Sequence, residues 1–223
     1  MFINQLETAF QKHSNAENAF AMAKYMKNRF PFFGIKTTER RELFKNIWKQ
    51  NKQEVSNNTK TIALALYAKE QRELHYCAIE ILIKGLKGNY QKDDIEFIEK
   101  LIITNSWWDS VDTIAKYILG QYLIEFPDCI ETTVEKFSNS NNMWLNRSAI
   151  LFQLGYKKET DFELLKAICI QHQSSTEFFI QKAIGWALRE YAKTDSEAVK
   201  NFVLVNNLKP LSRKEALKNL SDA

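Results

Sequence analysis

Residues 175–192, Ser175-Thr-Glu-Phe-Phe-Ile-Gln-Lys-Ala-Ile-Gly-Trp-Ala-Leu-Arg-Glu-Tyr-Ala192, carry the pattern that decides the fold. Apolar and aromatic residues recur in this stretch at intervals of three and four, which places them on one stripe of an α-helix. The members of this predicted core stripe are Ile180, Ala183, Ile184, Ala187 and Tyr191. The stretch therefore predicts an amphipathic helix that packs one face against the rest of the protein.

The same helical spacing continues in both directions along nearly the whole chain. It predicts helices over residues 2–13, 15–29, 38–51, 58–70, 72–87, 92–104, 107–125, 128–138, 142–156, 160–172, 176–193, 195–206 and 212–220. Four of them begin at residues suited to capping a helix, namely Thr37 or Thr38, Asn58 or Thr59, Ser106, and Ser212 with Glu215 three residues later.

Glycine and proline are scarce, with 6 and 3 among 223 residues, whereas an all-β protein needs many turns built on these residues. We therefore predict an all-α fold. The predicted helix pairs recur at intervals of roughly 35–40 residues, which is the period of HEAT-like repeats. No linker divides the chain, so we expect a single domain over 1–223, a curved α-solenoid of antiparallel helix pairs with a concave face.

The sequence argues against several classes of protein. It contains no stretch of 18 apolar residues that could span a membrane, and its start lacks the plan of a signal peptide. Cys77, Cys129 and Cys169 lie far apart among apolar residues, which predicts reduced core thiols in a cytoplasmic protein. The three histidines are isolated, so no metal site or metal cofactor is expected.

Charge is distributed unevenly along the chain. The net charge is +6 over residues 1–60, −5 over 61–140 and +3 over 141–223. Two basic ends around an acidic middle suit a body that grips a polyanion, although folding could also scatter these charges.

The segment Asn105-Ser-Trp-Trp-Asp-Ser-Val-Asp-Thr-Ile-Ala115 places two special residues on one helix face. Trp108 and Asp112 are four residues apart, so the ring lies one turn from the carboxylate. Ser106 and Asp109 form a plausible capping box, which explains Asp109 but not Asp112. One alternative is structural, with Trp108 in the core and Asp112 paired to Lys116.

A second segment, Asn142-Met-Trp-Leu-Asn-Arg-Ser-Ala-Ile-Leu-Phe-Gln-Leu-Gly-Tyr156, places Arg147 on the same stripe as Trp144, Leu151 and Leu154. An arginine on such an apolar stripe needs a carboxylate or another anion as a partner. Two alternatives stay open: a purely structural buried pair, or an arginine that holds Asp112 or a phosphate.

The predicted helix over 176–193 has a second face beside its core stripe. Phe178, Lys182, Trp186 and Arg189 share it, with Gly185 thinning the helix next to Trp186. A tryptophan between two cations is typical of a nucleic-acid surface, although a tryptophan at the margin of the core is the plainer alternative.

These segments together resemble the AlkD-like DNA alkylation repair family. The resemblance rests on Trp-Trp-Asp-x-Val-Asp at 107–112, Met-Trp-x-x-Arg-x-Ala-Ile at 143–150 and Lys-x-Ile-Gly-Trp-x-Leu-Arg-Glu-Tyr at 182–191. Two further stretches extend it to both ends, Tyr25-Met-Lys-Asn-Arg-Phe-Pro-Phe-Phe-Gly-Ile35 and Leu211-Ser-Arg-Lys-Glu-Ala216.

The resemblance implies a fold of HEAT-like helical repeats and the removal of alkylated purines from duplex DNA. It implies that Asp112 is the catalytic aspartate, that Trp108 and Trp186 contact the sugar, and that Arg147 is the active-site arginine. We accordingly expect a monofunctional DNA glycosylase that needs no cofactor and works as a monomer in the bacterial cytoplasm.

Affinity for duplex DNA is expected to come from contacts with its backbone. The candidate contacts are Tyr25, Lys27, Arg29, Lys36, Phe178, Phe179, Lys182, Arg189, Arg213 and Lys214.

Two alternative functions remain at the level of sequence. One is a non-catalytic binder of damaged or branched DNA with the same fold, which does not explain why Asp112, Trp108, Arg147 and Trp186 occur together. The other is a HEAT-repeat scaffold for protein interactions, which is a common role of helical repeats.

Overall fold

The protein is described from a computed structural model that covers residues 1–218 and 220. Every regular element among these residues is helical and no strand occurs in them, so the predicted all-α class is confirmed. The chain divides into two compact units, one from Met1 to Asn89 and one that starts at Tyr90. The single domain over 1–223, the HEAT-like curvature and the concave face stay predictions.

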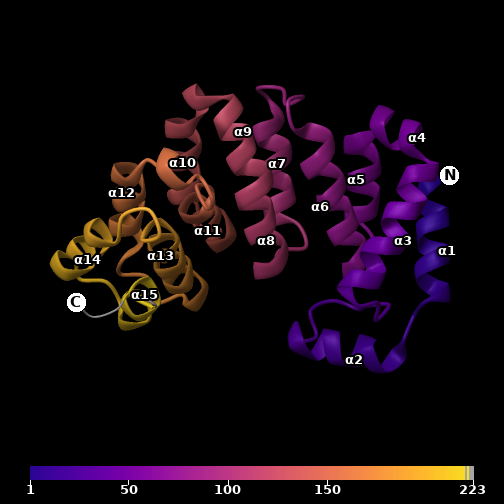
Figure 1. Cartoon of the computed structure of the whole chain (residues 1–223), viewed down its shortest axis with the longest axis horizontal. Helices are drawn as coiled ribbons and strands as arrows, with labels where there is room; N and C mark the ends of the chain where they lie inside the picture. Colours follow the sequence, from indigo (N-terminus) through magenta and orange to yellow (C-terminus); the bar gives the residue numbers. More distant parts are fainter. Residues whose placement is uncertain (219, 221–223) are drawn as a thin grey trace. The chain divides into compact units, whose positions relative to one another are not determined.

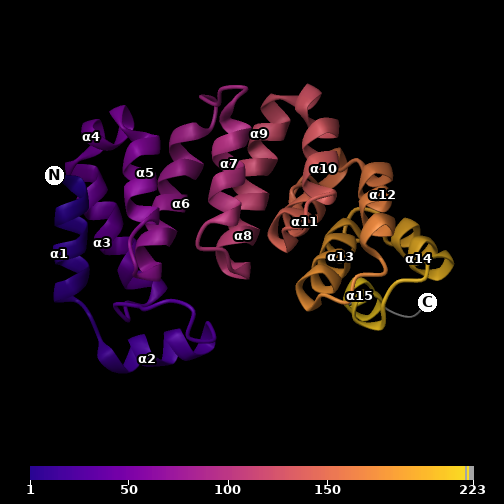
Figure 2. The same cartoon turned by 180° about the vertical axis from the view of Figure 1, so that it is seen from behind.

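The first unit holds six helices of the described chain (Figure 1). They are α1 (Phe2–Lys12), α2 (Ala16–Tyr25), α3 (Thr37–Gln50), α4 (Lys52–Asn57), α5 (Thr59–Tyr67) and α6 (Arg72–Leu86). Helices α5 and α6 pack side by side, as both views show (Figures 1 and 2). Helix α2 is different, because none of its residues is buried.

A buried carboxylate fixes the segment between α2 and α3. Glu73 accepts hydrogen bonds from the backbone amides of Phe33, Gly34 and Ile35 at 3.1, 2.8 and 3.2 Å. Gly34 has a φ of +88°, and a Cβ there would lie 2.1 Å from the carbonyl oxygen of Asn15. This turn therefore requires glycine. It fixes the course of the chain between exposed basic residues, with Lys27 and Arg29 before it and Lys36 after it.

The second unit contains the remaining elements. They are α7 (Asp94–Ile103), α8 (Trp108–Ile114), a π-helix (Ala115–Leu119), α9 (Gly120–Glu125), a 3₁₀ turn (Pro127–Cys129), α10 (Ile130–Ser138), α11 (Met143–Leu151), a second 3₁₀ turn (Lys157–Glu159), α12 (Phe162–His172), α13 (Phe178–Tyr191), α14 (Ser196–Val205) and α15 (Pro210–Ala216). Helix α11 packs against α7, α8, α10, α12 and α13, so it lies at the centre of this unit.

The observed helices follow the predicted ones closely, with three differences. The helix predicted over 107–125 is divided by the π-helix, which apolar spacing does not distinguish from an α-helix. The six residues of α4 are too few to show a period, and the prediction missed them. The last helix begins at Pro210, whose fixed φ suits a first turn, and ends at Ala216. The predicted end of that helix includes residue 219, which lies outside the described residues.

The predicted capping box at Ser106 is wrong. The hydroxyl of Ser106 donates to the carbonyl of Ile102 at 2.6 Å, and extended Trp107 takes the capping position of α8. The box at Ser212 is wrong for a similar reason, because the Ser212 hydroxyl donates to the carbonyl of Gln181 at 3.0 Å. The Ser106 hydroxyl bonds back to α7 four residues earlier and the Ser212 hydroxyl bonds across to α13, so neither starts a helix.

Two smaller predictions are corrected as well. Thr37 and Thr38 lie inside α3, and Lys36 occupies the capping position. Asn58 does occupy that position in α5, but its side chain makes no capping bond. Cys77 and Cys169 are buried free thiols as predicted, whereas Cys129 is only half-buried because it ends a 3₁₀ turn at the surface.

Candidate active site

The candidate site begins with Asp112 on α8. Trp107 is extended and α8 starts at Trp108, so Asp112 lies one turn into the helix, on the same face as Trp108. The Asp112 side chain is only 12% exposed. A carboxylate with so little access to water needs partners within the protein.

Arg147 on α11 supplies those partners. Its Nε and Nη2 atoms donate to Oδ1 and Oδ2 of Asp112 at 2.7 and 2.8 Å, which is the bidentate geometry of a strong ion pair. Its Nη1 donates to the backbone carbonyl of Phe179. The alternative in which Asp112 pairs with Lys116 is wrong. Arg147 pairs with Asp112, a contact that both a purely structural pair and an active-site pair predict.

This arrangement joins three helices of the second unit. Asp112 belongs to α8, Arg147 to α11 and Phe179 to α13, and α11 packs directly against both of the other helices. All three nitrogens of the guanidinium group make a bond within the protein. Arg147 therefore orients the carboxylate and is not poised to bind a phosphate.

Burial and the ion pair act in opposite directions on Asp112. Burial raises the pKa of this carboxyl above its ordinary value, and the Asp109 charge adds to that effect. The hydrogen bonds and the charge of Arg147 lower the pKa and oppose both. The carboxyl group is thus held with little water around it, and Arg147 is the partner that favours its ionised form.

An aromatic cluster that the sequence analysis did not predict supports this pair. The ring centroids of Trp107 and Trp144 lie 5.8 Å apart, and each lies 5.1 Å from that of Phe179. The Arg147 guanidinium carbon lies 5.9 Å from the Phe179 centroid. The sequence contains a signal for this cluster. Trp107 and Trp108 are adjacent at a helix start, so their side chains must point in different directions.

Trp108 and Trp186 are both half-buried, so each ring retains exposed surface. Trp108 shares the face of Asp112 on α8. Trp186 follows Phe179 by seven residues, or two turns, and therefore lies on the same side of α13 as the carbonyl that receives Arg147. All four predicted catalytic residues thus lie in the second unit, where two of them are in direct contact.

A second charged cluster lies on the same helix as Trp186. Glu215 of α15 pairs with Lys182 at 2.8 Å and with Arg189 at 2.6 Å. The hydrogen bonds from Lys182 and then Arg189 hold the pKa of Glu215 at about 2. The two cations predicted to contact phosphate therefore already share a counter-ion.

Gly185 explains how α15 comes so close. A Cβ at Gly185 would lie 2.4 Å from the Cβ of Glu215 and 2.8 Å from the carbonyl oxygen of Ser212. This glycine makes room for α15 and is buried, so the earlier interpretation that it thins a surface for nucleic acid is corrected.

The other predicted DNA contacts in this unit have different environments. Phe178 is 57% exposed, whereas Phe179 is half-buried in the aromatic cluster with Trp107 and Trp144. Arg213 and Lys214 are exposed on α15, and Arg213 donates to the carbonyl of Val203 at 3.3 Å.

The predicted contacts of the first unit surround the exposed helix α2. Tyr25 is 69% exposed at its end, and Lys27, Arg29 and Lys36 follow on exposed chain. These residues are accessible, and their contact with DNA stays a prediction.

Comparisons with known proteins identify the family. Residues 6–220 match the family described as DNA alkylation repair enzyme. This chain belongs to that family. A solved structure described as a predicted DNA alkylation repair enzyme from Enterococcus faecalis is 33% identical, with a TM-score of 0.86 over 94% of this chain and 98% of its own. The resemblance stated from the sequence is thereby confirmed, and the family supports a role in the repair of alkylated DNA.

A more distant structure shares the fold. The smu.31 protein from Streptococcus mutans UA159 is 15% identical, with a TM-score of 0.59 over 82% of this chain and 98% of its own. The comparison with curated proteins found no match.

Two further observations concern the described part of this repair protein. It contains no cluster of three or more His, Cys, Asp or Glu side chains that could hold a metal ion. Among the same residues, no helix combines the length and apolar composition needed to cross a bilayer.

Proposed function

We propose that this protein is a monofunctional DNA glycosylase that excises positively charged alkylated purines, of the 3-methyladenine and 7-methylguanine type, from duplex DNA. The observation that carries the proposal is the buried bidentate pair of Asp112 and Arg147. The half-buried Trp108 lies on the helix of Asp112, and the half-buried Trp186 lies on α13, whose Phe179 carbonyl also accepts a bond from Arg147. Membership of the repair family supplies the class of substrate.

The chemistry starts from the lesion itself. A purine alkylated at N3 or N7 is positively charged, so it leaves as a neutral base when the glycosidic bond breaks. No general acid has to protonate it. The bonding electrons go to the base, and the anomeric carbon of the deoxyribose acquires oxocarbenium character before water attacks it.

Asp112 supplies the complementary charge. A carboxylate that has little water around it stabilises a developing cation more strongly than one in bulk solvent, and it can orient the attacking water. Arg147 fixes both carboxylate oxygens, so the charge is in place before the reaction starts. In this proposal, the faces of Trp108 and Trp186 add cation–π attraction to the electron-poor sugar.

This mechanism makes selectivity a consequence of the leaving group. Neutral lesions and normal purines leave slowly unless they are protonated, and the pair offers no proton because Arg147 keeps Asp112 ionised. We therefore expect cationic adducts to be released and neutral ones to be retained.

The decisive test is release of 7-methylguanine from an alkylated duplex by the wild type and by Asp112→Asn. We expect a rate at least about 10²-fold lower in the variant, because the stabilising charge is gone. Asp128→Asn is the matched control, since Asp128 is 62% exposed and pairs with Lys92 at the surface of the same unit. Full activity in Asp112→Asn would rule the mechanism out.

The same assay separates the alternatives. A non-catalytic binder of damaged or branched DNA would retain duplex affinity in both proteins and release no base from either. A protein-interaction scaffold would show neither property. The monomeric state and the cytoplasmic location belong to this proposal, and sedimentation of the purified chain tests the first.

A further inference from the structure

The backbone carbonyl of Phe179 is the third anchor of the Arg147 guanidinium. Two of its nitrogens bond the Asp112 carboxylate, and the remaining one, Nη1, donates to this carbonyl. A helical carbonyl ordinarily accepts the amide four residues later, and its second lone pair is free for a side-chain donor. Two bonds to one carboxylate leave the pair able to swing as a unit about the aspartate side chain. The bond to Phe179 ties the pair to a fixed part of the fold.

The ring of Phe179 is packed in a way that fixes where this carbonyl lies. Its centroid lies 5.1 Å from that of Trp107 at an interplanar angle of 71°, and 5.1 Å from that of Trp144 at 43°. The two tryptophan rings also meet each other, at 5.8 Å and 63°. These are edge-to-face and tilted contacts, which aromatic pairs prefer to a face-to-face sandwich. Each ring contacts both of the others, so a shift of one displaces the other two.

The three rings come from the three helices that carry the ion pair. Trp107 occupies the capping position of α8, ahead of Asp112. Trp144 lies on α11 one turn before Arg147, and Phe179 lies in the first turn of α13. Trp107 is 8% exposed, and the other two rings are half-buried. The cluster therefore sets the spacing of α8, α11 and α13 next to the site.

Phe178 and Phe179 are neighbours in the chain with different surroundings. Phe178 is 57% exposed, and its ring meets that of Phe179 edge-on at 5.4 Å. Phe179 contacts this ring, both tryptophans and, at 5.9 Å from its centroid, the guanidinium carbon of Arg147. A ring with so many neighbours has little surface left for DNA.

We infer that Phe179 is a positioning residue of the excision site: its ring, held by Trp107 and Trp144, places the carbonyl that fixes Arg147. Arg147 in turn fixes the Asp112 carboxylate. This role concerns the rate of excision and not affinity for the duplex, in contrast to the DNA contact predicted from the sequence. The kinetic consequence rests on the proposed function, whereas the orientation of the pair can be measured without it.

Single-turnover release of 7-methylguanine at saturating enzyme tests the kinetic consequence in Phe179→Leu. Leucine retains an apolar side chain but lacks the ring that contacts both tryptophans. We expect the rate to fall at least about tenfold, because a misplacement of about 1 Å can cost about 10²-fold. The Kd for undamaged duplex should stay within about twofold, since the backbone contacts that supply affinity are unchanged. Phe179→Tyr retains the ring and should keep the rate within about threefold.

The pKa of Asp112 gives a readout that needs no excision. The hydrogen bonds and charge of Arg147 lower this pKa, against burial and the charge of Asp109. A less firmly anchored guanidinium lowers it less, so the Asp112 carboxyl should titrate at a higher pH in Phe179→Leu than in the wild type. Carbon-13 NMR of the side-chain carboxyls measures the midpoint, with Asp112→Asn to assign the signal. A ring that served stability alone would leave the midpoint unchanged.

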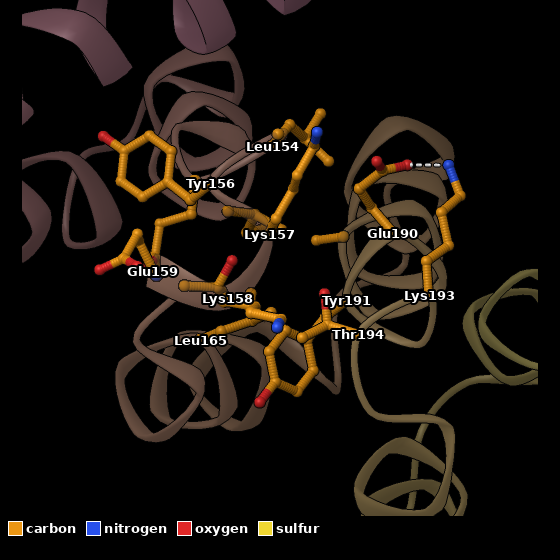
Figure 3. Close-up of a pocket in the computed structure, with 15 residues that line it drawn as sticks. Leu154, Tyr156, Lys157, Lys158, Glu159, Leu165, Glu190, Tyr191, Lys193 and Thr194 are labelled. Atoms are coloured by element: carbon orange, nitrogen blue, oxygen red, sulfur yellow. Dashed lines mark hydrogen bonds and ion pairs between the residues drawn. The ribbon is translucent and has the colours of Figure 1, made fainter.

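Phe162→Leu is the matched control. Phe162 is also half-buried in an aromatic cluster, because its ring stacks on Tyr191 at 4.2 Å and meets Phe202 at 6.2 Å. Tyr191 ends α13 beside a cavity that none of the predicted catalytic residues lines (Figure 3). This variant should lower the melting temperature and leave both the excision rate and the Asp112 midpoint unchanged.

Wild-type excision by Phe179→Leu would overturn the inference, as would equal losses of rate in Phe179→Leu and Phe162→Leu. A weaker Kd with an unchanged rate at saturation would instead make Phe179 a DNA contact. If Phe179→Leu does not fold, Trp144→Phe loosens the same contacts from α11, and it must lower the rate and raise the midpoint for the inference to stand. No release by the wild type would refute the proposed function, and the NMR midpoint alone would then decide the inference.

Discussion

The second unit contains two ion-paired clusters that are built in opposite ways. Asp112 and Arg147 are 12% and 5% exposed, and burial raises the pKa of the carboxyl. Glu215 is 14% exposed between two cations that are more accessible, Lys182 at 36% and Arg189 at 25%, and its pKa is lowered to about 2. The two carboxylates are about equally hidden from water, and the clusters differ in the accessibility of their cations and in the direction of the pKa shift.

Under the proposed function, the two clusters use charge for two purposes. A buried carboxylate stabilises a developing cation more strongly than an exposed one, because little solvent screens its charge. The triad of Glu215, Lys182 and Arg189 has one net positive charge, and its two cations are more accessible than Arg147. We therefore assign the first cluster to chemistry and the second to binding, and the following experiments test that assignment.

The largest effect is expected from Arg147→Ala. This variant leaves the buried Asp112 carboxylate without its partner, which should cost about 3–5 kcal/mol of unfolding free energy and abolish excision. Urea unfolding measures the first effect and release of 7-methylguanine the second. Adding Asp112→Asn to Arg147→Ala should restore part of the stability, because the unpaired charge is then removed.

Arg147→Lys is the conservative companion of that variant. It retains a positive charge but cannot bond both carboxylate oxygens in the planar fork that arginine offers, so stability and excision should fall between those of the wild type and Arg147→Ala. A loss of less than about 1 kcal/mol in Arg147→Ala would mean that the pair is not the buried cluster described here.

An intermediate effect is expected from pH. Since the pKa of Asp112 is raised, its carboxylate is neutralised at a higher pH than an ordinary aspartate. Excision should fall about tenfold per pH unit below that pKa, with a midpoint above the ordinary 3.8. Single-turnover rates on duplex carrying 7-methylguanine, corrected for release without enzyme, measure the midpoint.

The two carboxyls also have opposite effects on stability as pH changes. The contribution of Asp112, whose folded pKa is raised, is present below its unfolded pKa and is lost as pH rises through the folded one. The contribution of Glu215 is present above its unfolded pKa of about 4.5 and is lost as pH falls toward about 2. Chemical unfolding of Asp112→Asn and Glu215→Gln at several pH values separates the two contributions.

The smallest effect is expected from Glu215→Gln. Removing the counter-ion frees Lys182 and Arg189 for phosphate, so affinity for undamaged duplex should rise roughly three- to tenfold. The slope of log affinity against log salt should steepen by about one to two units. Fluorescence anisotropy at several salt concentrations measures both.

Glu197→Gln is the control for that experiment. Glu197 pairs with Lys200 on the exposed face of α14, so its loss also removes one surface carboxylate without freeing the α13 cations. Equal effects of the two variants would mean that only net charge matters. A fall in affinity of a normally folded Glu215→Gln would mean that Glu215 positions the cations for DNA instead of competing with it.

Local pattern was sufficient for much of the fold and for part of the site. Helical spacing located nearly every helix, because each amphipathic helix must bury one stripe whatever its neighbours are. An arginine on the apolar face of α11 demanded a carboxylate partner, and Asp112 was the candidate. The same reasoning failed at Ser106, whose hydroxyl bonds back to the preceding helix, and at Ser212, whose hydroxyl bonds to α13 once that helix packs against α15.

The sequence by itself determined the all-α class, the identity of the four candidate catalytic residues and their placement on helix faces. Only tertiary structure decided that every guanidinium nitrogen of Arg147 bonds within the protein, that Trp107 joins Trp144 and Phe179, and that Glu215 pairs with two α13 cations. Helix faces follow from spacing within one segment. Partners depend on which segments meet, and residues 26 to 72 positions apart in the chain meet only after the helices pack.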